Sequence, residues 1–199
     1  MCQLLETIKV LNKEFCNINF HNQRLNKSRK DLFNCSDFIE LEKNIYIPGN
    51  LAHGLYRCRV LYKKEIEKIE FISYKPKKIE TLKIVVCNEI NYSYKFADRN
   101  LFENLKNKYH DFDDILIVKN NFITDTSFSN IVFFDGSKWL TPFTPLLKGT
   151  KREIFLQKKI IFEKQIYPDD LKKFQKACLL NAMLDIDENN FISIGNIYF

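Results

Sequence analysis

The chain has 199 residues, of which 45% are hydrophobic and 28% are charged. This balance is that of an ordinary globular protein and excludes a disordered or fibrous chain. The net charge of +6 is spread over intermixed basic and acidic residues, so we expect a lysine-rich surface and no nucleic-acid partner. No apolar run reaches the length of a membrane span, and no signal-peptide pattern opens the chain. We therefore expect a cytoplasmic protein without a membrane partner.

The first part of the chain predicts a small mixture of strand and helix. Hydrophobic periodicity indicates a strand over residues 4–10, a helix over residues 20–33, and strands over residues 55–61 and 67–74. The run Lys75-Pro76-Lys77-Lys78 follows, and its proline and clustered charges are typical of a linker. We therefore divide the chain into a small N-terminal α/β lobe, residues 1–76, and a larger lobe, residues 77–199.

The second part alternates short strands with helices. We expect a strand over residues 81–87 and a helix over residues 99–109, capped by Asp98, with Leu101, Leu105 and Tyr109 as its buried stripe. Short strands are expected over residues 114–119, 122–124, 130–134 and 139–141, with a tight turn at Asn120-Asn121. Helices opening at Thr150 or Lys151 and at Pro168, then strands over residues 178–184 and 191–199, complete an α+β fold.

Two kinds of site are excluded by spacing alone. The five glycines are too far apart for G-x-G-x-x-G or for a P-loop. No paired cysteines or histidines stand at ligand spacing, so we expect no metal.

Several short segments, taken in order, resemble the class IV aminotransferase family, the pyridoxal-phosphate (PLP) enzymes of fold type IV. These segments are residues 5–10, residues 20–25 with His21-x-x-Arg24-Leu25, residues 94–99 with Lys95, residues 123–131, and Leu140-Thr141-Pro142 followed by residues 146–152, and the resemblance continues to Asn181-Ala182. The resemblance implies a two-lobed enzyme that has a trimmed small α/β lobe, because family members usually carry residues before the first strand, and a larger pseudo-barrel lobe. It also implies a homodimer acting on a small-molecule substrate.

The resemblance assigns a cofactor role to each matching residue. Lys95 matches the Schiff-base lysine, Arg24 the phosphate-binding arginine, and Leu147 the leucine beside the pyridine ring. Gly149, Thr150 and Lys151 match the turn whose backbone amides meet the phosphate, although threonine stands one place early here. Asp125 stands where the family usually has glutamate beside the ring nitrogen. Taken alone, each residue also fits an ordinary structural position; their order and spacing favour the site.

Two details favour one branch of the family. Lys95-x-x-Asp98-Arg99 resembles the K-x-x-N-R run of aminodeoxychorismate lyases, and Leu180-Asn181-Ala182-Met183 resembles their C-N-A-L loop. The implied reaction releases pyruvate and 4-aminobenzoate from 4-amino-4-deoxychorismate, a step of folate synthesis. The alternatives are a branched-chain or D-amino-acid aminotransferase, and a degenerate member that binds without catalysis, as the aspartate at position 125 would allow.

Substrate carboxylates require a cation, and the strand at residues 55–61 offers Arg57 and Arg59. We expect these two side chains to point to opposite faces, so that at most one meets the substrate, and we favour Arg59. His53 is a weaker candidate, and a solvated strand edge explains all three equally well. Asn181 and Ala182 are the remaining expected substrate contacts.

Overall fold

The computed structural model describes residues 2–199, which form two compact units. The first unit holds the residues up to Pro76 together with Tyr94–Asp98, and the second holds Lys77–Ser93 and Arg99–Phe199. The change of unit after Pro76 falls in the predicted linker. The return of Tyr94–Asp98 to the first unit was not predicted, because nothing in that short segment shows which strand it pairs with.

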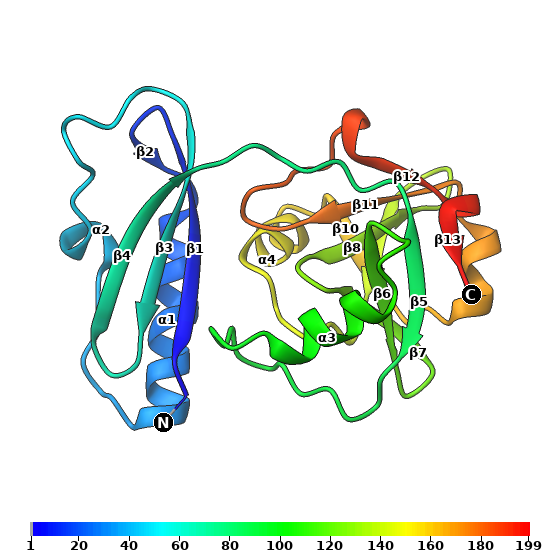
Figure 1. Cartoon of the computed structure of the whole chain (residues 1–199), viewed down its shortest axis with the longest axis horizontal. Coiled ribbons are helices and arrows are strands. Elements are labelled where there is room, and N and C mark those ends of the chain that lie inside the picture. The colour runs from blue at the N-terminus through cyan, green and yellow to red at the C-terminus, as the bar shows by residue number, and fades with distance from the viewer. Residues whose placement is uncertain (1) are drawn as a thin grey trace. The chain divides into compact units, whose positions relative to one another are not determined.

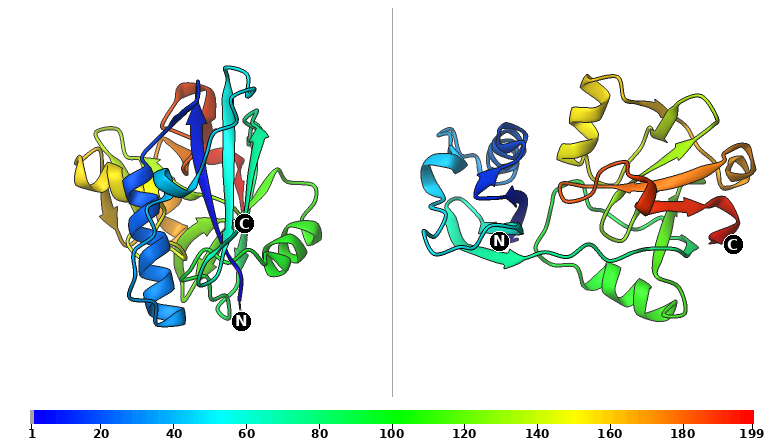
Figure 2. Two further views of the ribbon diagram at one scale, coloured as in Figure 1. Left: turned by 90° about the vertical axis from the view of Figure 1, so that its left-hand side faces the viewer. Right: turned by 90° about the horizontal axis from the view of Figure 1, so that it is seen from above.

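The first unit is an antiparallel sheet with helices on one side (Figure 1). Its strands follow the order β2-β1-β3-β4, and Figure 2 shows α1 and α2 on the same side of that sheet. The elements of this unit are β1 (Leu4–Leu11), β2 (Glu14–Phe15), α1 (Ile18–Phe33), α2 (Leu41–Asn44), β3 (Leu55–Tyr62) and β4 (Ile66–Ser73). The sequence did not predict β2 or α2, because neither is longer than about one period of its hydrophobic pattern.

The side chains of β1 alternate between the two faces of the sheet, and this alternation determines which of them lie in the core of the first unit. Leu4, Ile8 and Val10 are fully buried together with Leu25 of α1. Since side chains on a strand alternate between faces, Glu6 is carried to the same buried side. The fold therefore places a carboxylate in the core, and this carboxylate requires partners.

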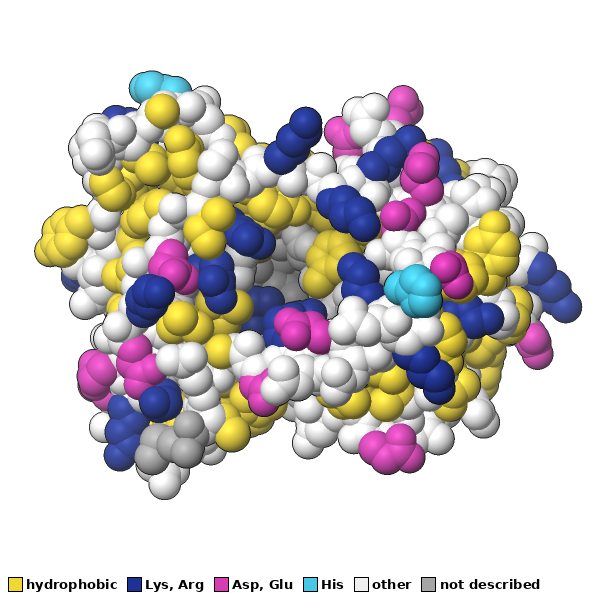
Figure 3. Space-filling view, viewed as in Figure 1, with side chains coloured by type: hydrophobic (Ala, Val, Ile, Leu, Met, Phe, Trp, Pro, Cys, Tyr) yellow, Lys and Arg dark blue, Asp and Glu magenta, His cyan; other side chains and the backbone are white. Residues whose placement is uncertain are grey.

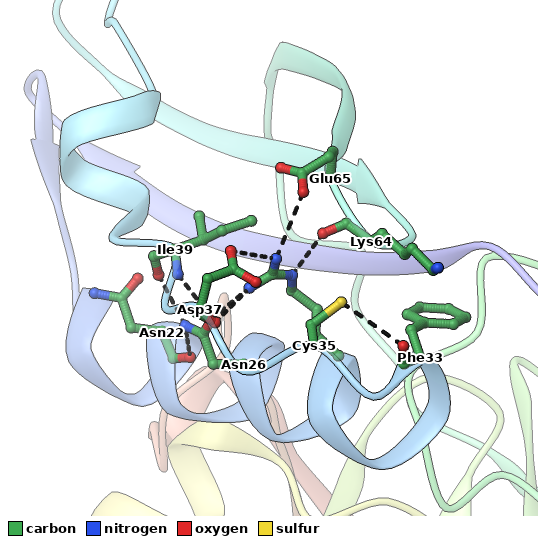
Figure 4. A network of polar contacts seen from close by, with 9 residues as sticks. Asn22, Asn26, Phe33, Cys35, Asp37, Ile39, Lys64 and Glu65 are labelled. Carbon is green, nitrogen blue, oxygen red and sulfur yellow. Dashed lines mark hydrogen bonds and ion pairs between the residues drawn. The ribbon is translucent and has the colours of Figure 1, made fainter.

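A second buried charge secures the end of α1. Arg29 is 0% exposed, and its Nε donates to the Lys64 carbonyl at 2.6 Å while its Nη2 lies 2.7 Å from Asp37 Oδ2. Figure 4 shows Asn26, Asp37, Lys64 and Glu65 gathered around this guanidinium group. These contacts join the β3–β4 turn to the segment after α1, so they explain Arg29 as structural.

The second unit is built on a nine-stranded mixed sheet, in which the strands follow the order β10-β9-β8-β7-β6-β5-β13 and β11 joins β8 to β12. Its strands are β5 (Leu82–Val86), β6 (Asp114–Lys119), β7 (Phe122–Thr126), β8 (Asn130–Phe134), β9 (Trp139–Pro142), β10 (Ile161–Lys164), β11 (Lys176–Leu180), β12 (Phe191–Ser193) and β13 (Ile197–Tyr198). Its helices are α3 (Asn100–Lys108) and α4 (Thr150–Gln157), with 3-10 turns η1 (Pro168–Lys173), η2 (Glu188–Asn190) and η3 (Ile194–Asn196). The predicted turn at Asn120-Asn121 is confirmed, since both residues have positive φ, 49° and 67°.

Three predictions for this unit were wrong in detail. Asp98 does not cap α3, which begins at Asn100, and Leu101 is 45% exposed while Phe102 is the buried residue. Phe102 turns inward because it packs edge-on against Tyr92, with ring centroids 4.8 Å apart. The strand predicted over residues 191–199 is broken by η3, which contains Gly195. The helix predicted from Pro168 is the 3-10 turn η1.

The surface carries both signs of charge. Figure 3 shows basic and acidic side chains interspersed on the visible face, without a basic stripe there. No helix within residues 2–199 is long and apolar enough to cross a bilayer. Over the same residues, no group of three His, Cys, Asp or Glu side chains is arranged to hold a metal ion.

Candidate functional site

In the first unit, Glu6 and Arg24 form a buried ion pair with two contacts. Arg24 Nε donates to Glu6 Oε1 at 2.8 Å, and Nη2 donates to Oε2 at 2.6 Å. Burial alone would raise the pKa of Glu6, but the charge of Arg24 and the hydrogen bonds from Arg24 and His21 outweigh it and hold the pKa at about 2. Glu6 is therefore ionised at every physiological pH.

His21 completes this group from one turn earlier on α1. Its Nδ1 lies 2.7 Å from Glu6 Oε2, and since an ionised carboxylate can only accept, Nδ1 carries the donated proton. Burial lowers the pKa of His21; the neighbouring Glu6 opposes this fall, and the charges of Arg24 and Lys95 add to it. His21 is 1% exposed, so a neutral imidazole is the form that the core accommodates.

Lys95 is carried to β1 by backbone pairing. Leu5 N donates to the Lys95 carbonyl at 2.9 Å, and Leu4 pairs with Phe96 in antiparallel fashion. This register sets Lys95 opposite Leu5, on the strand that also carries Glu6. The predicted amine and the predicted phosphate-binding arginine therefore belong to one unit, and the charge of Lys95 is felt at His21.

The expectation for Arg57 and Arg59 was wrong. Side chains two residues apart on a strand share a face, and the intervening Cys58 and the next residue, Val60, point into the core with 0% exposure. Both arginines therefore lie on the sheet face that α1 does not cover. Arg59 Nη1 donates to Glu70 Oε2 at 3.0 Å across the β3–β4 pair, whereas Arg57 Nε is buried without a hydrogen-bond partner among residues 2–199.

In the second unit, Asp125 stands on β7 directly opposite Asn130 of β8. Asn130 Nδ2 donates to Asp125 Oδ1 at 2.7 Å, and the Leu147 backbone N–H donates to Oδ2 at 3.0 Å. Burial raises the pKa of Asp125 to about 6, although these two hydrogen bonds oppose the rise. The charge of Arg152 also opposes it, but that guanidinium pairs with Glu163 at 2.6 Å.

Asp125 therefore differs from Glu6 in one respect. Its contacts come from neutral groups, and within residues 2–199 no lysine, arginine or histidine forms an ion pair with it. A buried carboxylate in this state is costly to ionise unless a cation is supplied from elsewhere.

Asn130 connects Asp125 to the turn before α4. The same Nδ2 also donates to the Leu147 carbonyl at 2.9 Å. A Cβ placed on Gly149 would lie 2.1 Å from Asn130 Oδ1, so any other residue there would force the Asn130 side chain to shift. Since Gly149 has φ −70°, close approach and not backbone strain requires the glycine.

Thr150 and Lys151 form the first turn of α4, where backbone N–H groups have no partner within the helix. Thr150 is 5% exposed. The Lys151 side chain is 7% exposed, and its Nζ pairs with Asp185 Oδ1 at 2.5 Å. Lys151 can therefore offer a backbone N–H group, while its ammonium is already paired.

Asn181 ends β11 by closing a turn. Its Oδ1 accepts from the backbone N–H groups of Met183 and Leu184 at 2.8 and 3.0 Å, and its Nδ2 donates to Ser129 Oγ at 2.7 Å. These bonds explain why the strand predicted to continue to residue 184 stops at Leu180. These bonds use Asn181 Oδ1 and one of the two Nδ2 protons within the chain, so the turn holds this side chain in place.

Sequence reasoning assigned no part in the site to Glu6 or His21. Alternation could have found Glu6, because an acid among Leu4, Ile8 and Val10 on the buried face must have a cationic partner. The spacing of three between His21 and Arg24 then puts both side chains on one face of α1.

Comparisons with known proteins show what the chain as a whole is similar to. Residues 93–186 match the family model for amino-transferase class IV. An uncharacterized protein of Haemophilus influenzae is 37% identical over 185 residues, which cover 92% of this chain and 98% of that protein. A crystal structure from Haemophilus somnus 129PT, described as a "putative 4-amino-4-deoxychorismate lyase", is 33% identical with a TM-score of 0.84, covering 92% of this chain and 97% of that one.

The chain belongs to the class IV aminotransferase family. The predicted family and the predicted two-lobed α+β fold are thereby confirmed, and with them the prediction of an enzyme. The structure of a hypothetical aminotransferase from Mycobacterium tuberculosis, in its PLP-bound form, has the same fold, with a TM-score of 0.74 at 15% identity. That match covers 98% of this chain and 81% of the other.

Proposed function

We propose that this class IV enzyme is a PLP-dependent 4-amino-4-deoxychorismate lyase, which converts its substrate to 4-aminobenzoate and pyruvate for folate synthesis. The observation that carries the proposal is the 33% identity, over nearly the full length of both chains, with the Haemophilus somnus structure described in those words. The run Lys95-x-x-Asp98-Arg99 and the Asn181-Ala182 turn support the same branch.

Each unit, taken by itself, holds residues that suit one part of PLP. When bound, PLP draws electrons from a substrate carbon into its protonated ring. Asp125 is a buried carboxylate that lacks a cation, and a protonated ring nitrogen would supply one. Arg24 and the N–H groups of Thr150 and Lys151 suit a phosphate, since a guanidinium and a helix start both favour anions. Leu147 would lie beside the ring.

Lys95 carries the proton transfer in this proposal. Its Nζ would hold the cofactor in the resting enzyme and, when free of it, would act as a base. The base removes the proton from the ring carbon that bears the amine. The C–O bond at the neighbouring ring carbon breaks, the ring becomes aromatic, and the departing enolpyruvate takes up a proton to become pyruvate.

The substrate carboxylates require a cation on the open face of the first sheet. Arg59 was favoured from sequence, but Glu70 already neutralises it. Arg57 lies on the same face with a buried Nε that lacks a partner, and a buried donor in that state costs about 1–3 kcal/mol until an acceptor arrives. We therefore propose Arg57, ahead of Arg59, as the carboxylate-binding residue.

Absorbance of the purified protein tests the cofactor assignment. Protein reconstituted with PLP should show a band near the visible range that Lys95→Ala abolishes, and the variant should lose about 100- to 10,000-fold in rate. The exposed Lys108→Ala on α3 serves as the control. Wild-type protein that takes up no PLP would contradict the proposal and favour a binding protein without catalysis.

A second assay separates lyase from aminotransferase. A lyase releases pyruvate from 4-amino-4-deoxychorismate with no keto-acid acceptor present. An aminotransferase consumes an amino donor only when an acceptor is added. Amino transfer without pyruvate release would replace the lyase assignment by the aminotransferase alternative.

The resemblance also leads us to propose a homodimer. Sedimentation equilibrium of the protein at micromolar concentration should give twice the chain mass of 23.8 kDa. A monomer that is fully active in the pyruvate assay would contradict this proposal.

A further inference from the structure

Glu6 is the most deeply buried carboxylate near the predicted phosphate-binding arginine. It is 0% exposed, and its two oxygens accept three hydrogen bonds, two from Arg24 and one from His21. A carboxylate that only neutralised a charge would need one contact. Three contacts from two residues fix the position of the carboxylate as well as its charge.

The contacts with Arg24 also fix the plane of the guanidinium group. Two parallel N–H to oxygen bonds make a fork that allows little rotation. They use Nε and one proton of Nη2, so Glu6 does not contact Nη1 or the second Nη2 proton. Because Glu6 stands on β1 and Arg24 on α1, the guanidinium is held by both layers of the first unit.

His21 supports this arrangement without adding a charge. Burial keeps its pKa low, so it donates to Glu6 as a neutral imidazole. The three residues then carry one negative and one positive charge, whose sum is zero. Glu6 and His21 are 0% and 1% exposed and the Arg24 side chain is 15% exposed, so this part of the core can accommodate such a sum, whereas an extra cation would be costly.

We propose that Glu6 is the positioning residue for Arg24, and that it presents the outer edge of the guanidinium to the phosphate of PLP. This inference rests on the proposed function. A free arginine side chain loses about 2 kcal/mol of rotamer entropy when a ligand fixes it. Glu6 fixes it before the ligand arrives, so phosphate binding does not bear that cost.

Glu6 could affect phosphate binding in two opposite ways, and this makes the proposal testable. Glu6 also cancels the charge of Arg24, and its removal would strengthen attraction for a phosphate if charge alone mattered. Positioning predicts weaker binding after Glu6→Gln, whereas neutralisation predicts tighter binding. The sign of the change therefore decides between the two.

The experiment compares PLP with pyridoxal, which lacks the phosphate. Dissociation constants are measured by absorbance and fluorescence for wild type, Glu6→Gln and Glu6→Asp. We expect Glu6→Gln to weaken PLP at least about 10-fold, the loss of a charged hydrogen bond, and to leave pyridoxal unchanged. Glu6→Asp keeps the charge but is shorter, so it should fall between the two.

Glu42→Gln is the matched control. Glu42 also accepts a hydrogen bond from α1, at 2.7 Å from Asn22 Nδ2, but it does not contact Arg24. In Glu42→Gln, the ratio of the dissociation constants for PLP and pyridoxal should equal that of wild type. Equal losses of both ligands in Glu6→Gln, or tighter PLP binding, would overturn the positioning role.

Two further outcomes are distinguishable. If Glu6→Gln does not fold, Glu6→Asp tests the inference in its place. A ratio of PLP to pyridoxal dissociation constants that is unchanged from wild type in Glu6→Asp would overturn the inference. If wild type binds neither ligand, the proposed function itself fails and this inference fails with it.

Discussion

Two buried carboxylates, one in each unit, are treated in opposite ways by their surroundings. Glu6 has a guanidinium and an imidazole within 2.8 Å, and its pKa is held at about 2. Asp125 has an amide and a backbone N–H group, and burial raises its pKa to about 6. The charge of Glu6 is neutralised by an ion pair within the first unit. Asp125, in contrast, has no ion pair with any of residues 2–199, so it requires a positive charge from a ligand. A protein tolerates the second arrangement where a ligand brings the charge.

The largest effect that separates the two carboxylates is on turnover. Asp125→Ala removes the proposed partner of the ring nitrogen, so we expect kcat to fall about 100-fold or more while the absorbance band of the Lys95 adduct remains. Glu6→Gln should change PLP affinity and leave kcat at saturating PLP nearly unchanged. Steady-state kinetics at several PLP concentrations measure both. Equal losses of kcat in Asp125→Ala and Glu6→Gln would contradict the assignment of different roles to the two carboxylates.

The second effect is the dependence of stability on pH, which should have opposite signs for the two residues. The pKa of Glu6 falls from 4.5 to about 2 on folding, so its contribution is present above pH 4.5 and is lost as pH falls toward 2. The pKa of Asp125 rises from 3.8 to about 6, so its contribution is present below pH 3.8 and is lost as pH rises toward 6. Each pKa shift corresponds to a contribution of roughly 3 kcal/mol to the free energy of unfolding.

Urea denaturation of PLP-free protein between pH 3 and 7 tests these signs. The difference in unfolding free energy between wild type and Glu6→Gln should shrink as pH falls below 4.5. The difference between wild type and Asp125→Asn should change between pH 4 and 6, with wild type losing stability as pH rises. Parallel curves for wild type and Asp125→Asn would mean that Asp125 has an ordinary pKa.

A third and smaller effect, on the KM for the substrate, distinguishes Arg57 from Arg59, which lie on the same face of β3. Arg57→Gln should raise the KM for the substrate about 10-fold, the value of a charged hydrogen bond, with kcat and PLP absorbance unchanged. Arg59→Gln is the matched control, because Glu70 already pairs with Arg59. A raised KM in Arg59→Gln alone would restore the residue that the sequence favoured.

The last effect, read as a coupling of about 0.5 kcal/mol or more between two residues, concerns the support of Asp125. Gly149→Ala would push a Cβ to 2.1 Å from Asn130 Oδ1 and displace the amide that binds Asp125. We expect a loss of about 1–3 kcal/mol in stability. In an Asn130→Ala background the added methyl group has room, so the penalty should fall by at least about 0.5 kcal/mol. Additive penalties in this double-mutant cycle would show that Gly149 and Asn130 are not coupled.

The sequence predicted well where a pattern is local. The alternation of Leu4, Ile8 and Val10 gave β1, and Asn120-Asn121 gave its turn, because each depends on neighbouring residues only. The order of the motifs gave the family. The site was harder, because the contact of Glu6 with Arg24 joins residues 18 positions apart. The face shared by Arg57 and Arg59 did follow from strand geometry, and our expectation for it was an error of reasoning rather than a limit of the sequence.

The segment Tyr94–Asp98 has a topological consequence. The chain passes between the units three times, after Pro76, after Ser93 and after Asp98. A protease that cuts within Lys75–Lys78 therefore severs only one passage. The N-terminal fragment would retain β1, and the C-terminal fragment would retain Lys95, whose strand stays bonded to Gln3 and Leu5. The enzyme is thus suited to fragment complementation, with Lys95, the proposed reactive amine, on one piece and the strand that pairs with its segment on the other.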